Sequence, residues 1–472
     1  MIDIFNRKQI LLGSLFMGLL ALSANALGAN WLTLQGTEPE GAEQLGKVWG
    51  FVQVQYQDDS SDPNGAGGYI PPKLIGPNLE TQSAFNVNRA RIGVRGVAMP
   101  IDQKINYFLL LEMGNNGITE PGNSFAKATD ASVTLNHFDG ARFRLGLFKF
   151  PGSEEGLQAI HVFDYINFTW VTNQMLLERF PNANYTPNNA PQSLPPGTRL
   201  NGFDDGVGAF RDVGVQMFDW FNVGNDWELS YAIMIGNGNG LNFGDNDDNK
   251  DTYIYASAEK VFGGKGPRRQ GLKFFAWSQS GKRTADLSAD TCSNGNVFPA
   301  CGAGGSGRIS TVYDPVEYDR DRMGFGVKYL RNGWRATAEY MEGDGMIFQA
   351  PHNASFGIGP GQGIPGAPAG NGALAEATGY YVEGGYRFPK SKWELDLRYD
   401  VYNRLDGNQF EIEFERTTFG VQYFFNPRVR LALNYEARSG DAPNFGPGAG
   451  PNGNVDGIDD RIALQITAIW SQ

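Results

Sequence analysis

Three arginines on one stretch of the chain have the type and spacing to act on anions. Arg89, Arg91 and Arg95 are separated by even numbers of residues, with apolar Ile92 and Val94 between them. Because side chains alternate between the two faces of a β-strand, the three guanidinium groups would share one face. A guanidinium is a planar fork that donates paired hydrogen bonds to oxyanions. The pattern therefore predicts attraction of anions.

A structural interpretation of the same arginines stays open. Glu112 lies on the next predicted strand and could pair with Arg89 or Arg91. In that case the guanidinium groups would brace the wall of a β-structure without touching a solute. For any single arginine, bracing and contact with an ion both fit the sequence.

Basic side chains recur on the same face of later predicted strands. The whole chain carries a formal net charge of −12, but its excess acidic residues fall in predicted loops. When alternation along the strands is used to assign side chains to the two faces, the face that holds the arginines carries more basic than acidic residues. A net-positive wall attracts anions. The strand-borne candidates for an anion path are Arg89, Arg91, Arg95, Lys104, Arg142, Arg144, Arg428 and Arg430.

The strands that would position these side chains number sixteen. Segments of alternating apolar and polar residues run through the chain, and the spacers between them alternate in length. Short spacers include Asp139-Gly140, Asn332-Gly333 and Asn426-Pro427, of which the first two are typical of tight hairpins. The pattern predicts an all-β fold, a 16-stranded antiparallel transmembrane β-barrel with short periplasmic turns and long extracellular loops.

The sequence divides into three predicted parts. Residues 1–26 resemble a secretory signal peptide, with Arg7 and Lys8 before a short apolar run and Ala24-Asn25-Ala26 at the expected cleavage site. Residues 27–46 form a short N-terminal leader of unclear role. The β-barrel is predicted to occupy residues 47–472, which leaves no room for a second domain.

The longest spacer, residues 151–210, is rich in apolar and aromatic side chains such as Phe163, Phe168 and Trp170. On an outer surface these side chains would be exposed to water. We therefore expect the segment to fold into the barrel as a constriction loop, with a wholly extracellular loop as the alternative.

The sequence offers no catalytic site and no metal site. There is no G-x-S-x-G nucleophile motif, and only three histidines are dispersed along the chain. No cofactor is expected, and the acidic balance argues against nucleic acid as a partner. Cys292 and Cys301 lie in a Gly-rich hydrophilic stretch, where a disulfide is favoured for an exported protein. A metal pair would lack further ligands.

Several motifs, taken in order, resemble the phosphate-selective porin O and P family. They lie at Phe85–Gly96, Asp130–Val133, Arg144–Pro151, Arg211–Gln216, Gly236–Gly238 with Asp248–Asp251, and Thr418–Val421 with Asn426–Leu431. The resemblance implies a trimer of sixteen-stranded barrels and an arginine ladder that leads to a basic constriction with an inward loop. Its carry-over positions are Arg89, Arg91, Arg95, Arg144, Lys149 and Arg211. The chain departs from the family in ending Trp470-Ser471-Gln472 and in carrying many acids on its wall.

The predicted function is that of an outer-membrane porin for passive diffusion of small solutes. We expect a preference for anions, with phosphate or other oxyanions possible, and the partners would be outer-membrane lipid, small anionic solutes and further copies of the chain in a homotrimer. One alternative is a weakly selective general porin. Others are a structural barrel that sheathes a partner such as an electron-transfer cytochrome, and an adhesin that displays acidic loops.

Overall fold

The structure is a computed structural model that describes most of the chain after its first thirty-one residues. The described residues are 32, 36–38, 46–61, 83–98, 100–116, 119, 125–176, 209–224, 226–238, 240–241, 244–245, 248–264, 268–285, 288–292, 308–312, 316–344, 376–404, 406–407, 411–447, 452 and 456–470. The predicted signal peptide lies outside the described residues.

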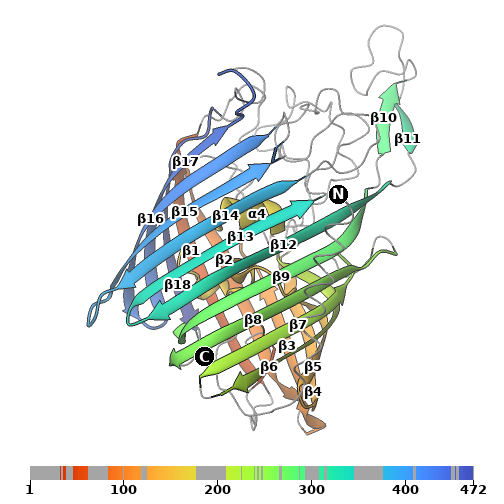
Figure 1. Ribbon diagram of the computed structural model, residues 1–472, viewed down its shortest axis with the longest axis vertical. Coiled ribbons are helices and arrows are strands. Elements are labelled where there is room, and N and C mark those ends of the chain that lie inside the picture. The colour runs from red at the N-terminus through yellow and green to blue at the C-terminus, as the bar shows by residue number, and fades with distance from the viewer. Residues whose placement is uncertain are drawn as a thin grey trace.

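Sixteen strands pair in antiparallel fashion and close on themselves (Figure 1). This confirms the predicted barrel. The closing seam joins the first strand to the last, and β10 (Ser288–Cys292) and β11 (Arg308–Val312) form a separate two-stranded sheet between β9 and β12. The barrel strands are β1 (Lys47–Asp59), β2 (Ser83–Ala98), β3 (Asp102–Glu112), β4 (Lys127–Phe138), β5 (Ala141–Lys149), β6 (Arg211–Val223), β7 (Trp227–Gly236), β8 (Asp251–Gly263), β9 (Gln270–Ala285), β12 (Val316–Arg331), β13 (Trp334–Asp344), β14 (Ala377–Arg387), β15 (Trp393–Arg404), β16 (Ile412–Asn426), β17 (Val429–Asp441) and β18 (Arg461–Trp470).

Alternation along each strand separates an apolar outer face from a polar inner face. In β16, for example, Arg416 and Thr418 are buried, whereas Phe419 is 54% exposed. Three tryptophans, Trp334, Trp393 and Trp470, are exposed at the short-turn ends of their strands. An apolar band edged by aromatic residues is the outer surface that a lipid-embedded barrel needs. No helix among the described residues is long and apolar enough to span a membrane.

Two-residue turns join strands at one end of the barrel, as the sequence predicts. Asn332 and Gly333 both have positive φ, +51° and +88°, in the link between β12 and β13. Both central residues of a type I′ turn need that conformation, and Asn-Gly provides it at little steric cost. Such a turn matches the twist of the two strands and fixes their register.

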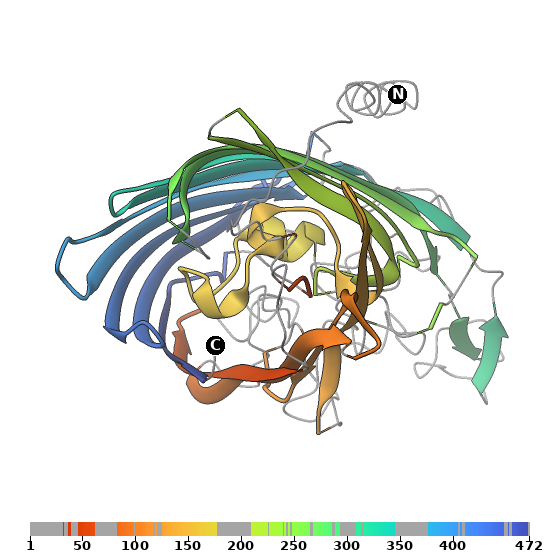
Figure 2. The same cartoon turned by 90° about the horizontal axis from the view of Figure 1, so that it is seen from below.

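A long segment between β5 and β6 lies inside the barrel (Figure 2). It contains α3 (Glu154–Leu157), the 3₁₀ helix η2 (Ile160–Val162) and α4 (Trp170–Leu176). Its side chains pack against inward-facing wall residues such as Tyr381 and Phe414 in one buried cluster. We call residues 151–176 the interior segment. Residues 177–208 of the predicted constriction loop lie outside the described residues.

Candidate pore wall and its cationic patch

Five of the ten predicted anion-path residues come together on one part of the inner wall. We call them the cationic patch: Arg89 and Arg91 on β2, Arg144 and Lys149 on β5, and Arg211 on β6. All five side chains are buried, at 1–7% exposure. The charges of Arg89, Arg91 and Arg211 act on Lys149, and Asp130 acts on Lys149, Arg144 and Arg211. Five of the six positions that the family resemblance implies are thus members of the patch.

Two members of the cationic patch are paired with carboxylates. Arg91 Nε donates to Glu112 Oε2 at 2.6 Å. Arg211 Nη2 donates to Asp130 Oδ2 at 3.0 Å, and its Nε donates to the same oxygen at 3.1 Å. Buried ion pairs of this kind hold their partners in place, because removal of either partner leaves an uncompensated charge. For Arg91 and Arg211, these contacts are the ones that the bracing interpretation expects, and their role in an anion path stays a prediction.

The other three members contact only neutral acceptors among the described residues. Arg89 Nη1 donates to the amide oxygen of Gln53 at 3.0 Å. Lys149 Nζ donates to the carbonyls of Gly156 and Gln158, both at 2.8 Å. Arg144 Nη2 donates to the carbonyl of Leu32 at 2.9 Å. The patch therefore holds five basic side chains and two carboxylates, so basic groups outnumber acidic ones.

His161 adds no positive charge to this region at neutral pH. It belongs to η2 of the interior segment, and its ring lies 5.0 Å from that of Phe51. Burial, assisted by the charges of Arg91, Arg430 and Lys149, lowers the pKa of His161 to about 3. The histidine therefore stays neutral beside the patch, and the net charge there comes from the arginines and the lysine.

Arg95 and Arg142 each pair with a carboxylate outside the cationic patch, although the charge of Arg95 also acts on Arg144. Arg95 Nε donates to Glu38 Oε1 at 2.5 Å. Arg142 pairs with Asp219 and stacks over the ring of Trp220, with its Cζ 3.9 Å from the ring centroid. Both arginines are partly exposed. Their pairing makes them part of the wall's internal bracing.

The remaining predicted residues are dispersed. Arg430 donates to the amide of Gln422 at 2.9 Å and to the carbonyl of Phe163 at 2.7 Å, so it holds the interior segment. Lys104 and Arg428 are exposed near short turns. Their role in an anion path stays a prediction.

The predicted disulfide also remains a prediction. Cys292 ends β10, which pairs with β11 outside the barrel. Cys301 lies outside the described residues. Among the described residues, no group of three or more His, Cys, Asp or Glu side chains is arranged to hold a metal ion.

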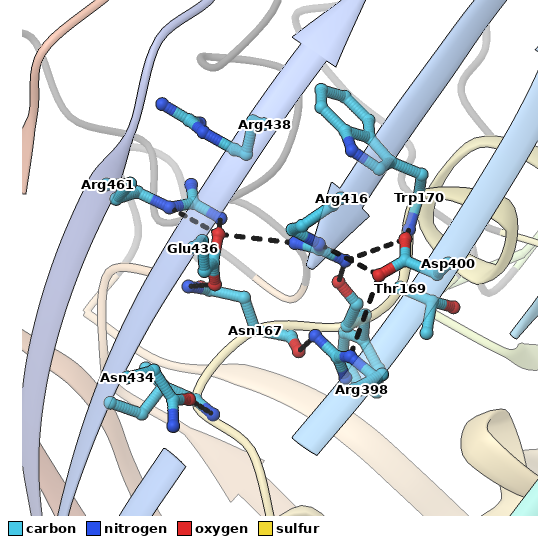
Figure 3. A network of polar contacts seen from close by, with 12 residues as sticks. Asn167, Thr169, Trp170, Arg398, Asp400, Arg416, Asn434, Glu436, Arg438 and Arg461 are labelled. Atoms are coloured by element: carbon cyan, nitrogen blue, oxygen red, sulfur yellow. Dashed lines mark hydrogen bonds and ion pairs between the residues drawn. The ribbon is translucent and has the colours of Figure 1, made fainter. Parts of the chain in front are cut away.

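The wall formed by β15 to β18 carries charges that alternate in sign (Figure 3). Arg416 lies between Asp400, at 2.9 Å, and Glu436, at 3.3 Å. Glu436 also pairs with Arg461 at 2.5 Å. All four side chains are fully buried. In contrast to the cationic patch, the arginines of this cluster contact wall carboxylates, so we call Arg398, Asp400, Arg416, Glu436 and Arg461 the paired wall.

The paired wall fastens the interior segment through backbone groups. Arg416 Nη2 donates to the carbonyl of Phe168 at 2.6 Å, and Arg398 Nη2 donates to that of Asn167 at 2.9 Å. In the opposite direction, the Trp170 amide donates to Asp400 Oδ2 at 2.7 Å. These carbonyl partners of Arg416 and Arg398 could not be predicted, because backbone carbonyls of a non-periodic segment carry no sequence signal.

A second attachment joins the interior segment to the wall at Glu154. Lys273 and Lys328 both donate to its carboxylate, at 2.5 and 2.8 Å. Burial opposes ionisation of Glu154, but the two lysines outweigh burial and lower its pKa to about 2. The carboxylate is therefore charged at neutral pH and anchors the first turn of the segment.

A model of the family described as "Phosphate-selective porin O and P" matches residues 357–444. The match includes the late hairpin around Asn426 and Pro427, one of the motifs on which the resemblance rests. The earlier motifs lie outside the matched range. No curated protein matches the sequence.

Solved structures with a similar shape are outer-membrane proteins. A loop-deletion mutant of OmpT, an outer membrane protein of Vibrio cholerae, is 11% identical with a TM-score of 0.49, and the match covers 90% of this chain and 100% of that one. The outer membrane channel DcaP of Acinetobacter baumannii is 12% identical with a TM-score of 0.47, covering 92% and 100%. Pseudomonas putida OprB is 10% identical with a TM-score of 0.48, covering 90% and 94%. At such low identity the likeness extends no further than the barrel. The closed barrel and the matched family model together identify an outer-membrane β-barrel channel that is similar to the phosphate-selective porin O and P family.

Proposed function

We propose that the chain forms a passive outer-membrane channel that prefers small anions to cations, with phosphate and other oxyanions among its solutes. The observation that carries this proposal is the surplus of positive charge in the cationic patch. Arg89, Arg144 and Lys149 have neutral partners only, whereas the acids of the paired wall are matched by arginines.

A charge in surroundings of low dielectric constant produces a stronger field than the same charge in water, and that field reaches ions in the adjacent pore. An anion that passes the patch gains attraction from three basic side chains that have no carboxylate among their hydrogen-bond partners in the described residues. Their present partners are amide and carbonyl oxygens, which an anion can outcompete because hydrogen bonds to charged acceptors are stronger. Transport stays downhill, and selectivity comes from wall charge and pore width.

The alternative functions differ in what they require of the interior. A sheath around a partner protein would need an open lumen, but the interior segment packs against the wall there. A weakly selective general porin needs a wall whose charges cancel, whereas basic side chains outnumber carboxylates in the cationic patch. A homotrimer in lipid is part of the proposal, supported by outward apolar side chains such as Leu397, which is 52% exposed.

The test is the reversal potential across a salt gradient in planar bilayers. Arg89→Gln combined with Lys149→Gln removes two basic groups that are hydrogen-bonded only to neutral acceptors, and the chloride-over-potassium permeability ratio should fall. Arg331→Gln is the matched control, because Arg331 is exposed at the end of β12 and lies against the ring of Phe262. A wild-type channel without anion preference would favour the general porin, and a barrel that passes no current would favour the sheath or the adhesin.

A further inference from the structure

Part of the N-terminal leader lies against the inner wall of the barrel. The side chain of Leu32 is 2% exposed and belongs to the same buried cluster as the interior segment. Gly36 has a φ of +75°, and a Cβ placed there would lie 3.1 Å from Phe108 Cβ and 3.5 Å from Ser132 Oγ. A side chain at this position would be strained both by the backbone conformation and by the wall. We call Leu32, Gly36, Thr37 and Glu38 the N-terminal insert.

The N-terminal insert binds two wall arginines. The Thr37 carbonyl accepts from Arg95 Nη2 at 2.9 Å, and the Glu38 carboxylate accepts from Arg95 Nε at 2.5 Å. The Leu32 carbonyl accepts from Arg144 Nη2 at 2.9 Å. Each contact spans at least 57 residues of sequence, so the insert is held by tertiary interactions.

The position of the insert along the barrel follows from the start of β1. Lys47, the first residue of β1, pairs with Arg95 near the end of β2, and only residues 99–101 separate β2 from β3. β1 therefore begins at the short-turn end. The Glu38 amide donates to Asn106 Oδ1 at 3.0 Å, and Asn106 is buried on the inner face of β3. The four described residues of the N-terminal insert thus occupy the interior at the end where β1 starts.

We propose that the N-terminal insert is a built-in restriction of the channel and that Glu38 is a residue that sets its charge selectivity. The insert occupies interior volume beside β2, β3 and β5, so it narrows the path for solutes. The Glu38 carboxylate neutralises Arg95, and the Leu32 carbonyl occupies Arg144 of the cationic patch. The narrowing does not depend on the proposed anion preference, whereas the role of Glu38 rests on it.

The experiment compares two variants of the full chain in planar bilayers. Gly36→Val forces the insert away from Phe108, so the single-channel conductance should rise above that of the wild type. Glu38→Gln keeps the shape of the side chain and removes its charge, so the reversal potential should shift towards greater chloride preference. Glu415→Gln is the matched control, because Glu415 lies on the outward-facing side of β16 and accepts from Tyr399. Heat-dependent migration on gels establishes first that each variant forms a barrel.

The outcomes separate this proposal from the proposed function. A wild-type conductance in Gly36→Val would overturn the restriction, whatever the selectivity of the channel. An unmoved reversal potential in Glu38→Gln would overturn the assignment of Glu38 in a channel that prefers anions. If the wild type shows no anion preference, the proposed function fails, yet a larger conductance in Gly36→Val would still support the restriction.

Discussion

Arg91 donates from Nε to Glu112 Oε2 at 2.6 Å, across the pair formed by β2 and β3. The same carboxylate accepts from the backbone amide of Ala90 at 2.9 Å. Glu112 therefore links the side chain of Arg91 to its own strand, and the arginine is a structural brace. Arg89, two residues earlier on the same face, has only the amide of Gln53 as its partner among the described residues. Neighbouring arginines of one strand thus have different roles.

This difference predicts that selectivity depends on Arg89 and not on the Arg91–Glu112 pair. Arg91→Met together with Glu112→Met removes a neutral pair and should leave the reversal potential near that of the wild type. Arg89→Met removes one unmatched charge, which attracts a monovalent ion 4 Å away by about 1 kcal/mol even in water. The permeability ratio should therefore fall by a factor of roughly five. Equal shifts in the two variants would show that Arg91 also acts on permeating ions.

Glu436 is predicted to be a strong determinant of stability. Glu436→Gln leaves the buried guanidinium groups of Arg416 and Arg461 without their shared carboxylate. Removal of one partner from a buried ion pair costs about 3–5 kcal/mol, and the free energy of unfolding in urea should fall by that order. The control is Glu415→Gln on the outer face, which should change stability by less than about 1 kcal/mol. Equal losses would mean that the paired wall contributes no special stability.

Glu154 is predicted to make stability depend on pH in acid. Its pKa is about 2 in the folded chain and ordinarily 4.5, so its contribution to stability is complete above pH 4.5 and is lost as the pH falls towards 2. The contribution is on the order of 3 kcal/mol. Glu154→Gln should therefore reduce the free energy of unfolding at pH 7 and flatten its decline below pH 4.5. Urea unfolding at several pH values measures both, and an unchanged slope would contradict the role of the two lysines.

Gly146 is predicted to tolerate no side chain. It has a φ of +121°, and a Cβ there would lie 2.2 Å from the carbonyl oxygen of Ala131 on β4. A non-glycine residue in this backbone region costs about 1–3 kcal/mol, and the clash adds to that cost. Gly146→Ala should lower the midpoint of urea unfolding, whereas Gly244→Ala should not, because a Cβ at Gly244 meets open space. Equal midpoints would show that β5 can shift without loss.

The barrel could be predicted from the sequence because its rules are local. Alternation along a strand decides which side chains face lipid, and the exposed Leu397 and Phe419 follow it. Turn chemistry decides where a strand reverses, and Asn332-Gly333 has the two positive φ values that its residue types favour. The small sheet of β10 and β11 was not predicted, because it lies within a long spacer without clear periodicity.

Only part of the cationic patch could be predicted from strand alternation. Arg144 and Lys149 are five residues apart, and an undistorted strand places residues at an odd separation on opposite faces. Both nevertheless donate to backbone carbonyls of segments inside the barrel, Arg144 to Leu32 and Lys149 to Gly156. Gly146, which has a positive φ, lies between them in β5. Alternation alone would have missed Lys149, which the family resemblance supplied. The contacts of Glu38 with the wall were missed because they join segments far apart in the sequence.

The interior segment has a consequence for how the molecule is assembled. Trp170, Val171 and Met175 are at most 1% exposed, so the barrel encloses a hydrophobic core formed by the interior segment. The seam between β1 and β18 joins the two ends of the barrel sequence. If the seam formed first, these side chains would have to enter a finished ring through its mouth. If the interior segment packs on β14 and β15 first and the other strands then pair around it, these side chains never have to enter a closed barrel. Pairing of β1 with β18 is therefore expected to be the last step of folding.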